Sequence, residues 1–439
     1  MKILFLFFVP LITWAQCEGS YYFEDQSSID NFIRDYGDCD KIDSLEIVLR
    51  CSGNRITNFD SLINIKKINY FKISAECSNL SIDGLANLRK VNFFQTYDLD
   101  SINSVYQFEN LDSIEHLDLS GREISSDLAN FKYTEYIAKL TLRGAGNCLG
   151  LSATAKSSLK SIAILHGKRD GNLSELINGN YLESLIIRNI ENFSVSPPDS
   201  LTQISNLSCI NSPGIDLTPL SMMKITGAIN IINNEESVPI FQNVDTIDII
   251  QLSLLEDLTD FKTKFPNLVK VNSYLSVFES SNLERLGINK IEIPYGKPFS
   301  NYLIYTRVRI EENPKLKECE EEFLCEALNA YPDSVILENN GEFCNLDNIT
   351  EYCKTVSTKE FDNKNIKLYP NPASDYISLD SSIKDFDLYI IINASGQIVQ
   401  TGHIDSNQIN ISNLSSGIYS MCFRSEWDYV NLKFVKNSL

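Results

Sequence analysis

The chain is poor in histidine, tryptophan and basic residues. Of its 439 residues only 3 are histidine and 2 are tryptophan, and 38 Lys and Arg stand against 58 Asp and Glu, for a formal net charge of −20. A surface with this excess of negative charge repels nucleic acid and anionic lipid. The composition therefore argues against polyanion-binding classes and favours a protein that stays soluble outside the cell.

Motifs of the common catalytic and metal sites are also missing from the sequence. It contains no HExxH, GxSxG, P-loop or EF-hand loop. His116 lies beside an apolar strand position, and we expect it to be a structural surface residue. The acidic run Glu318–Glu322 lacks the Asp/Asn/Gly spacing of a calcium loop and is interpreted as a solvated face. No cofactor or metal is expected.

Only one long apolar run is present, Met1–Ala15, with the sequence MKILFLFFVPLITWA. One Lys precedes an apolar core of about a dozen residues, which is shorter than the roughly 20 residues of a transmembrane helix. Ala15 is a small residue suited to cleavage, so we predict a secretory signal peptide over residues 1–15 and no transmembrane segment. Lipidation of Cys17 is disfavoured because Gln16 precedes it, whereas lipid-modified cysteines normally follow a small residue.

Apolar pairs recur along the chain with a period in the low twenties. Leu117 and Leu119 flank a polar residue, which is typical of a half-buried strand. Equivalent pairs follow at spacings of 22 or 23 residues, and a last one after 18: Leu140 and Leu142, Ile162 and Ile164, Leu185 and Ile187, Leu207 and Cys209, Ile229 and Ile231, Ile247 and Ile249. One short strand per repeat of this length predicts a mostly β solenoid over residues 16–353.

Cysteines gather at both ends of the predicted solenoid. An amphipathic helix at Ser27–Gly37 opens an N-terminal cap over residues 20–52, which we expect Cys39 and Cys51 to staple. A C-terminal cap over residues 312–353 contains Cys319, Cys325, Cys344 and Cys353. In an exported protein we expect disulfides there, with unassigned pairing, rather than zinc, since no Cys-x-x-Cys pair is present.

The helix, the cysteine and the repeats Ile56–Ile68 and Leu80–Val91 together resemble the receptor L-domain form of leucine-rich repeat. The resemblance covers roughly residues 25–345. It implies a right-handed β-helix with short helical caps.

Residues at equivalent outward positions of successive repeats are expected to form columns across the strands. Glycoside hydrolysis needs two carboxylates about 5–10 Å apart, and strands are stacked about 4.8 Å apart. The first column has two acids with five repeats between them: Asp118, Thr141, Ala163, Ile186, Ser208, Asn230, Asp248. The second has none: Ser120, Arg143, Leu165, Arg188, Ile210, Ile232, Ile250. Arg143 and Arg188 around Leu165 are a candidate patch for an acidic or glycan ligand; alternatively, the apolar members of this column are simply buried.

A polar linker over residues 354–365 precedes a segment of different character, 366–439. Its short strands and turns predict a small antiparallel β-sandwich. Several motifs resemble, in order and spacing, the type A C-terminal sorting domain of type IX secretion cargo in the phylum Bacteroidota. The motif residues are Tyr369, Pro370, Asn371, Pro372, Asp375, Gly396, Gly417, Tyr419, Lys433 and Lys436. The resemblance implies Sec transport, recognition by the type IX machinery, removal of the domain, and release or surface attachment.

Taken together, these features favour a secreted or cell-surface, non-enzymatic binding or adhesion protein. Its solenoid face would recognise an extracellular glycan or protein that the sequence does not identify. The alternative is a polysaccharide-active or peptidase-like cargo with acids carried on loops.

Overall fold

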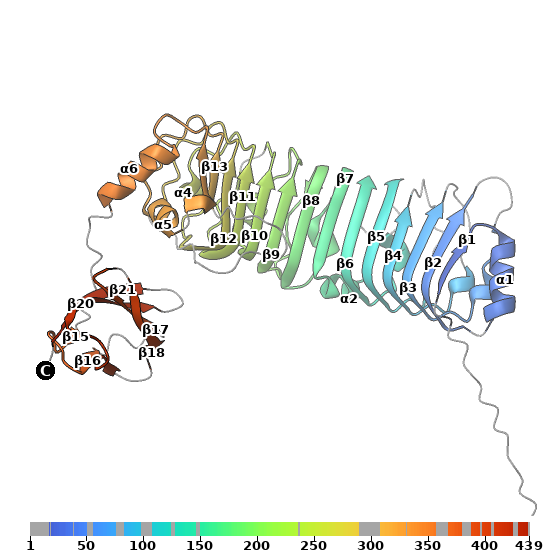
Figure 1. Ribbon diagram of the computed structural model, residues 1–439. Coiled ribbons are helices and arrows are strands. Elements are labelled where there is room, and N and C mark those ends of the chain that lie inside the picture. The colour runs from blue at the N-terminus through green and yellow to red at the C-terminus, as the bar shows by residue number, and fades with distance from the viewer. Residues whose placement is uncertain are drawn as a thin grey trace, which may run out of the picture. The chain divides into compact units, whose positions relative to one another are not determined.

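The chain is described from a computed structural model (Figure 1). The structure describes residues 17, 19–37, 39–50, 56–75, 83–97, 108–123, 128–145, 150–235, 238–288, 308–330, 332–356, 368–379, 388–395, 397–404, 408–424 and 429–437. The predicted signal peptide, Cys51, most of the linker and Gly396 lie outside this range. The chain divides into two compact units, with the change from the first to the second between Ile349 and Thr350.

The first unit is built on one parallel sheet. Among the described residues it has 14 strands, and each pairs with its neighbours in chain order. The strands are β1 (Ser20–Phe23), β2 (Lys41–Leu49), β3 (Lys67–Ala75), β4 (Lys90–Tyr97), β5 (Ser113–Glu123), β6 (Tyr136–Ala145), β7 (Ser161–Asn172), β8 (Tyr181–Ser194), β9 (Gln203–Ile210), β10 (Lys224–Ile232), β11 (Thr246–Ser253), β12 (Lys270–Phe278), β13 (Val308–Glu311) and β14 (Val335–Glu338). This order agrees with the predicted solenoid of one strand per repeat.

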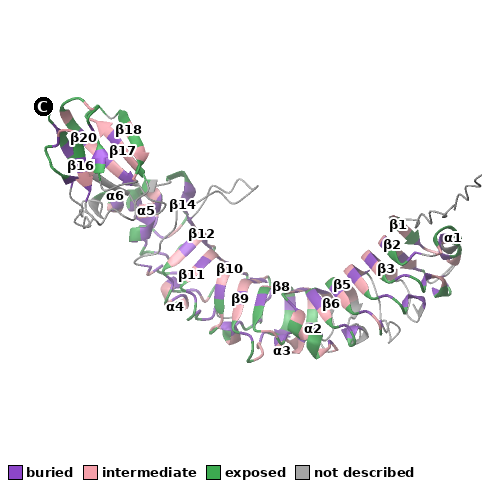
Figure 2. Ribbon diagram, turned by 90° about the horizontal axis from the view of Figure 1, so that it is seen from below, coloured by how far each residue is buried: buried purple, intermediate pink, exposed green. Residues whose placement is uncertain are grey.

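The core lies on one side of this sheet. Leu117, Leu140 and Leu185 are at most 1% exposed, and the register aligns Leu117 with Leu140 across β5 and β6. Full burial of such a side chain contributes about 1.5–3 kcal/mol, so the stacked apolar pairs are the main stabilising element. Figure 2 shows the sheet on the inner side of a curved unit, with α2 (Ala153–Ser158), α3 (Leu173–Leu176) and α4 (Phe261–Lys264) on the outer side.

Six turns between repeats are held by asparagine side chains. In each case the Nδ2 group donates to a backbone carbonyl of the preceding repeat, which satisfies an acceptor that the turn leaves unpaired. The bonds run from Asn64 to Gly37, Asn87 to Ile63, Asn110 to Ala86, Asn243 to Met222, Asn267 to Gln242 and Asn282 to Glu256, at 2.6–3.0 Å.

The N-terminal cap differs from the prediction in two respects. Helix α1 spans Gln26–Tyr36 instead of the predicted Ser27–Gly37, and its N-cap is Asp25, whose Oδ1 accepts the Ser28 N–H at 2.8 Å. Cys39 forms a disulfide with Cys17, with Cα atoms 5.9 Å apart, which corrects the expected pairing with Cys51. The reason is the short strand β1, which pairs in parallel with β2. Cys17 and Cys39 precede these two strands, so the pairing brings them to the same edge of the sheet. A disulfide-bonded Cys17 is also unavailable for lipidation.

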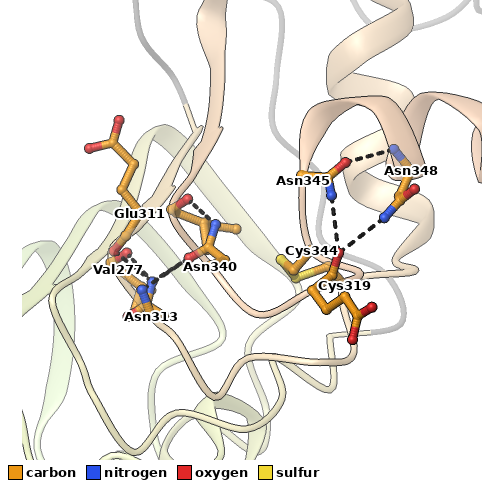
Figure 3. Close-up of a disulfide and its surroundings, with 10 residues drawn as sticks. Val277, Glu311, Asn313, Cys319, Asn340, Cys344, Asn345 and Asn348 are labelled. Atoms are coloured by element: carbon orange, nitrogen blue, oxygen red, sulfur yellow. Dashed lines mark hydrogen bonds between the residues drawn. A yellow bond between two sulfur atoms is a disulfide. The ribbon is translucent and has the colours of Figure 1, made fainter.

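The C-terminal cap contains the predicted helices and disulfides. A disulfide joins Cys319 to Cys344, beside α5 (Glu322–Ala330) and α6 (Leu346–Val356) (Figure 3). Cys325 and Cys353 are also disulfide-bonded. A buried asparagine fastens the last strands: Asn313 donates to the carbonyls of Val277 and Glu311 at 3.1 and 2.8 Å, as Figure 3 shows.

The second unit contains two antiparallel sheets, which agrees with the predicted small β domain. One has the order β15-β16-β19 and the other β18-β17-β20-β21. The strands are β15 (Leu368–Tyr369), β16 (Tyr376–Leu379), β17 (Leu388–Asn393), β18 (Ile398–His403), β19 (Gln408–Asn410), β20 (Gly417–Arg424) and β21 (Tyr429–Lys436). Its core includes Ile391, Met421 and Phe423.

Candidate functional site

The sheet of the first unit presents a second side, made of the residues that alternate with the core positions. We give the name N-terminal face to this set of outward residues on β1–β6: Tyr22, Ser44, Glu46, Tyr70, Lys72, Phe93, Gln95, His116, Asp118, Thr141 and Arg143. We give the name central face to the outward aliphatic residues of β7–β10 and the arginine among them: Ala163, Leu165, Ile186, Arg188, Ile210 and Ile232. The strand registers place each set in adjacent columns.

Rings stack along the N-terminal face. Tyr70 and Phe93 occupy equivalent positions of β3 and β4, and their ring centroids are 5.3 Å apart with nearly parallel planes. Phe93 meets the His116 ring edge-on at 4.7 Å. Such pairs contribute about 0.5–1.5 kcal/mol beyond the area they bury. The rings are half-buried, so their remaining surface faces solvent.

A chain of polar contacts runs beside the rings. Tyr70 donates its hydroxyl to Gln95 Oε1 at 3.0 Å, and Gln95 Nε2 donates to Asp118 Oδ2 at 3.5 Å. Arg143 Nε donates to Asp118 Oδ1 at 3.0 Å, and this carboxylate is only 3% exposed. The polar groups of this face are therefore held in place before any ligand binds.

Two ionisable groups on this face have shifted pKa values. Burial lowers the pKa of His116 below its ordinary value, so the imidazole is neutral at pH 7, and its Nε2 lies 3.0 Å from the Thr141 hydroxyl. The hydrogen bond from Lys72 to Glu46, at 2.6 Å, raises the pKa of the ammonium group. His116 is thus half-buried, with its ring against Phe93 and its Nε2 beside Thr141.

The predicted patch of Arg143 and Arg188 does not form a shared basic site. The register does place Leu165 between them. However, Arg143 is neutralised by Asp118, whereas Arg188 is exposed and has no ion-pair partner among the residues described. Leu165, Ile210 and Ile232 are half-exposed rather than buried, so the central face is an aliphatic surface around one free cation.

The predicted columns break at β11. Ile231 pairs with Leu252, so this repeat has 21 residues between equivalent positions instead of 18. Gln251 and Ser253 therefore take the places assigned to Asp248 and Ile250, and Ile250 is a core residue. The first column consequently holds Asp118 as its single acid between β5 and β11.

A shallow groove of about 800 Å³ lies outside these columns, where turns lead into β9–β12. Its lining includes Asp199, Asp245, Lys224 and Met222. The columns of outward strand residues do not include this groove, because its lining side chains come mainly from turns. Within the described part of the chain, no group of three or more His, Cys, Asp or Glu could hold a metal ion. No helix found among those residues is long and apolar enough to cross a membrane.

In the second unit, the predicted motif residues converge from both ends of the domain. Asn371 donates through Nδ2 to the Lys433 carbonyl at 3.1 Å and accepts the Val435 N–H through Oδ1 at 2.9 Å. Lys436 is buried, donates to the Ser374 carbonyl and lies 3.9 Å from an Asp375 oxygen. The first motif thus completes the edge of the last strand.

The other motif residues divide into core and surface. Tyr419 is buried, stacks on Phe434 at 5.5 Å and donates its hydroxyl to the Ser415 carbonyl at 2.8 Å. Tyr369 is 53% exposed, and Pro370, Pro372 and Lys433 are also exposed. The exposed members are therefore available to a partner, whereas the buried ones hold the fold.

Comparison with known proteins identifies this second unit. Residues 367–437 match the family described as a secretion system C-terminal sorting domain. No curated protein matches the chain. The C-terminal unit therefore carries a type IX sorting domain, which implies interaction with that secretion machinery and a destination in the medium or on the cell surface.

Proposed function

We propose that the chain is a secreted or surface-displayed binding protein that recognises an extracellular glycan or protein through the outward side of its parallel sheet. The observation that carries this proposal is the composition of that side. Beside its ion pairs, it presents half-exposed rings on the N-terminal face and half-exposed aliphatic side chains on the central face. Exposed patches of this kind mark interaction sites.

Export would begin with cleavage of the signal peptide after Ala15 and continue through the sorting domain. The disulfide at Cys17 supports a mature chain that starts close before it and reaches an oxidising compartment. The parallel sheet and its capped ends also support kinship with receptor L-domain leucine-rich repeats, and the sorting motifs support an origin in Bacteroidota.

The test is saturable binding by the full chain to arrays of polysaccharides and purified extracellular proteins. We expect the exchange Ile186→Lys, on the central face, or Tyr70→Ala, on the N-terminal face, to weaken binding. Ile63→Lys, at an exposed turn, is the matched control. Loss of binding in the control alone would contradict the proposal.

A polysaccharide-active enzyme is the second candidate, favoured by the groove that Asp199 and Asp245 share. Glycoside hydrolysis uses such a pair of carboxylates. Sustained release of reducing sugar that disappears in both Asp199→Asn and Asp245→Asn would establish this candidate in place of the binding function.

A further inference from the structure

We propose that the N-terminal face contains a sugar site in which a pyranose ring of a neutral glycan stacks on the open side of Tyr70. This inference rests on the proposed binding function and names its ligand class and position. The site consists of Tyr22, Ser44, Glu46, Tyr70 and Lys72, which lie on the first three strands of the sheet.

Among the described strands, the register places a second ring against one side of Tyr70 and a serine against the other. Phe93 stacks against the side that faces β4. On the other side the register places Ser44 of β2 opposite Tyr70, and Ser20 of β1 opposite Ser44. Neither serine side chain is long enough to cover a phenol ring. An aromatic face that carries negative quadrupole charge is therefore open to the C–H groups of a sugar.

Hydrogen-bonding groups border the open ring. Glu46 and Lys72 occupy neighbouring positions in the next column and pair at 2.6 Å, with side chains 32% and 26% exposed. The ammonium group has three donors and the carboxylate several lone pairs, so one mutual bond leaves capacity for sugar hydroxyls. Tyr22, in register with Glu46 and 51% exposed, adds a second ring at the side.

The ion pairs beside Tyr70 favour a neutral ligand. Glu46 is paired with Lys72, and Asp118 is paired with Arg143. A uronate or sulfate would have to compete with Glu46 for Lys72 and would leave that carboxylate without its partner. A neutral sugar can bond to both members of the pair without separating them. A protein ligand, in contrast, is better matched by the aliphatic central face.

The test is affinity electrophoresis of the full chain in gels cast with laminarin, arabinoxylan, mannan or polygalacturonate. We expect at least one neutral polysaccharide to retard the wild-type protein. The exchange Ser44→Phe adds a ring on the open side of Tyr70 and should weaken that binding about tenfold or more. Ser184→Phe makes the same change in the same column of β8 and should bind like the wild type.

The proposal is overturned if only polygalacturonate retards the protein, if no polysaccharide does, or if Ser44→Phe binds as well as Ser184→Phe. Circular dichroism of both variants separates blocking from misfolding, and Tyr22→Ala, at an exposed position, should weaken binding independently. Binding of a purified protein that is lost in Ile186→Lys would leave the proposed function standing without this site. Turnover of any polysaccharide would remove both.

Discussion

The ion pair of Asp118 and Arg143 shows how a single residue on the outward side can be structural. Arg143→Gln would leave a nearly buried carboxylate with Gln95 as its remaining side-chain donor. We expect a loss of about 1–3 kcal/mol in the free energy of unfolding, the usual cost of an unsatisfied buried group. Urea denaturation would measure it. Arg188→Gln, an exposed and unpaired position in the same column, should change stability by less than about 0.5 kcal/mol; equal losses in both variants would contradict the assignment.

His116 provides a pH-dependent prediction at the same scale. Its pKa in the folded protein is lowered below 6.5 by burial, so the unfolded chain binds the proton more readily. Stability that this residue contributes is complete above the unfolded pKa and falls as the pH drops through it. An NMR titration should show an imidazole pKa below 6.5, and His116→Asn should flatten the change in unfolding free energy between about pH 7.5 and 5.5. A folded pKa at or above 6.5 would refute this.

Sequence alternation located individual residues well where the repeat length was constant. Leu117, Leu140 and Ile162 are core residues, as predicted. Asp118 and Thr141 are neighbours in the first outward column, also as predicted. The same reasoning failed at Asp248, because Ile247 with Ile249 and Ile250 with Leu252 are two apolar pairs of the same spacing. Only the pairing with β10 selects the second pair. The partner of Cys39 was missed for a similar reason, since it depends on a four-residue strand.

At the scale of elements, asparagine side chains link several turns to the preceding repeat. Asparagine followed by an aliphatic residue recurs before successive strands, at Asn64, Asn87, Asn110, Asn243, Asn267 and Asn282. That pattern was available in the sequence, but its role depends on carbonyls one repeat away. In the structure Asn313 contacts the preceding β12 at Val277.

Substitution of a turn asparagine should cost more stability at a buried turn than at an exposed one. Asn313 is fully buried, and Asn313→Ala would remove its bonds to the carbonyls of Val277 and Glu311 and to the Ser280 N–H. Each group left unsatisfied costs about 1–3 kcal/mol. Asn110→Ala removes one exposed bond and should cost about 0.5–1.5 kcal/mol. Thermal unfolding of both variants would decide, and an equal effect would show that burial is not the determining factor.

The whole molecule combines a sorting domain, recognisable from separated motifs, with a solenoid whose ligand no motif identifies. The motifs could be found because the Asn371 side chain bonds to the backbone of Lys433 and Val435, and the Lys436 side chain reaches Ser374 and Asp375. These contacts across the domain constrain a residue type at each end. A binding surface imposes no comparable pattern. The open ring of Tyr70 depends on Ser44 in another strand, and this neighbour is known only once the register is known.

Export should depend on the contact between the two ends of the sorting domain. Asn371→Ala removes both bonds to the last strand, and we expect less protein in the medium and more precursor retained in the cell. Immunoblots of the two fractions would show this. Asn348→Ala, the same exchange in the first unit, should be exported normally. Normal export of Asn371→Ala would show that this contact is dispensable.

The central claim is that an exported, disulfide-tied solenoid reaches the outside of the cell after losing both end segments. Intact mass of the protein recovered from the medium and cell surface, before and after reduction, tests it most directly. We predict a chain from Gln16 to a residue within 354–365 whose mass increases on reduction because paired thiols take up hydrogen. A product that retains residues 433–439 and gains no mass on reduction would contradict the account.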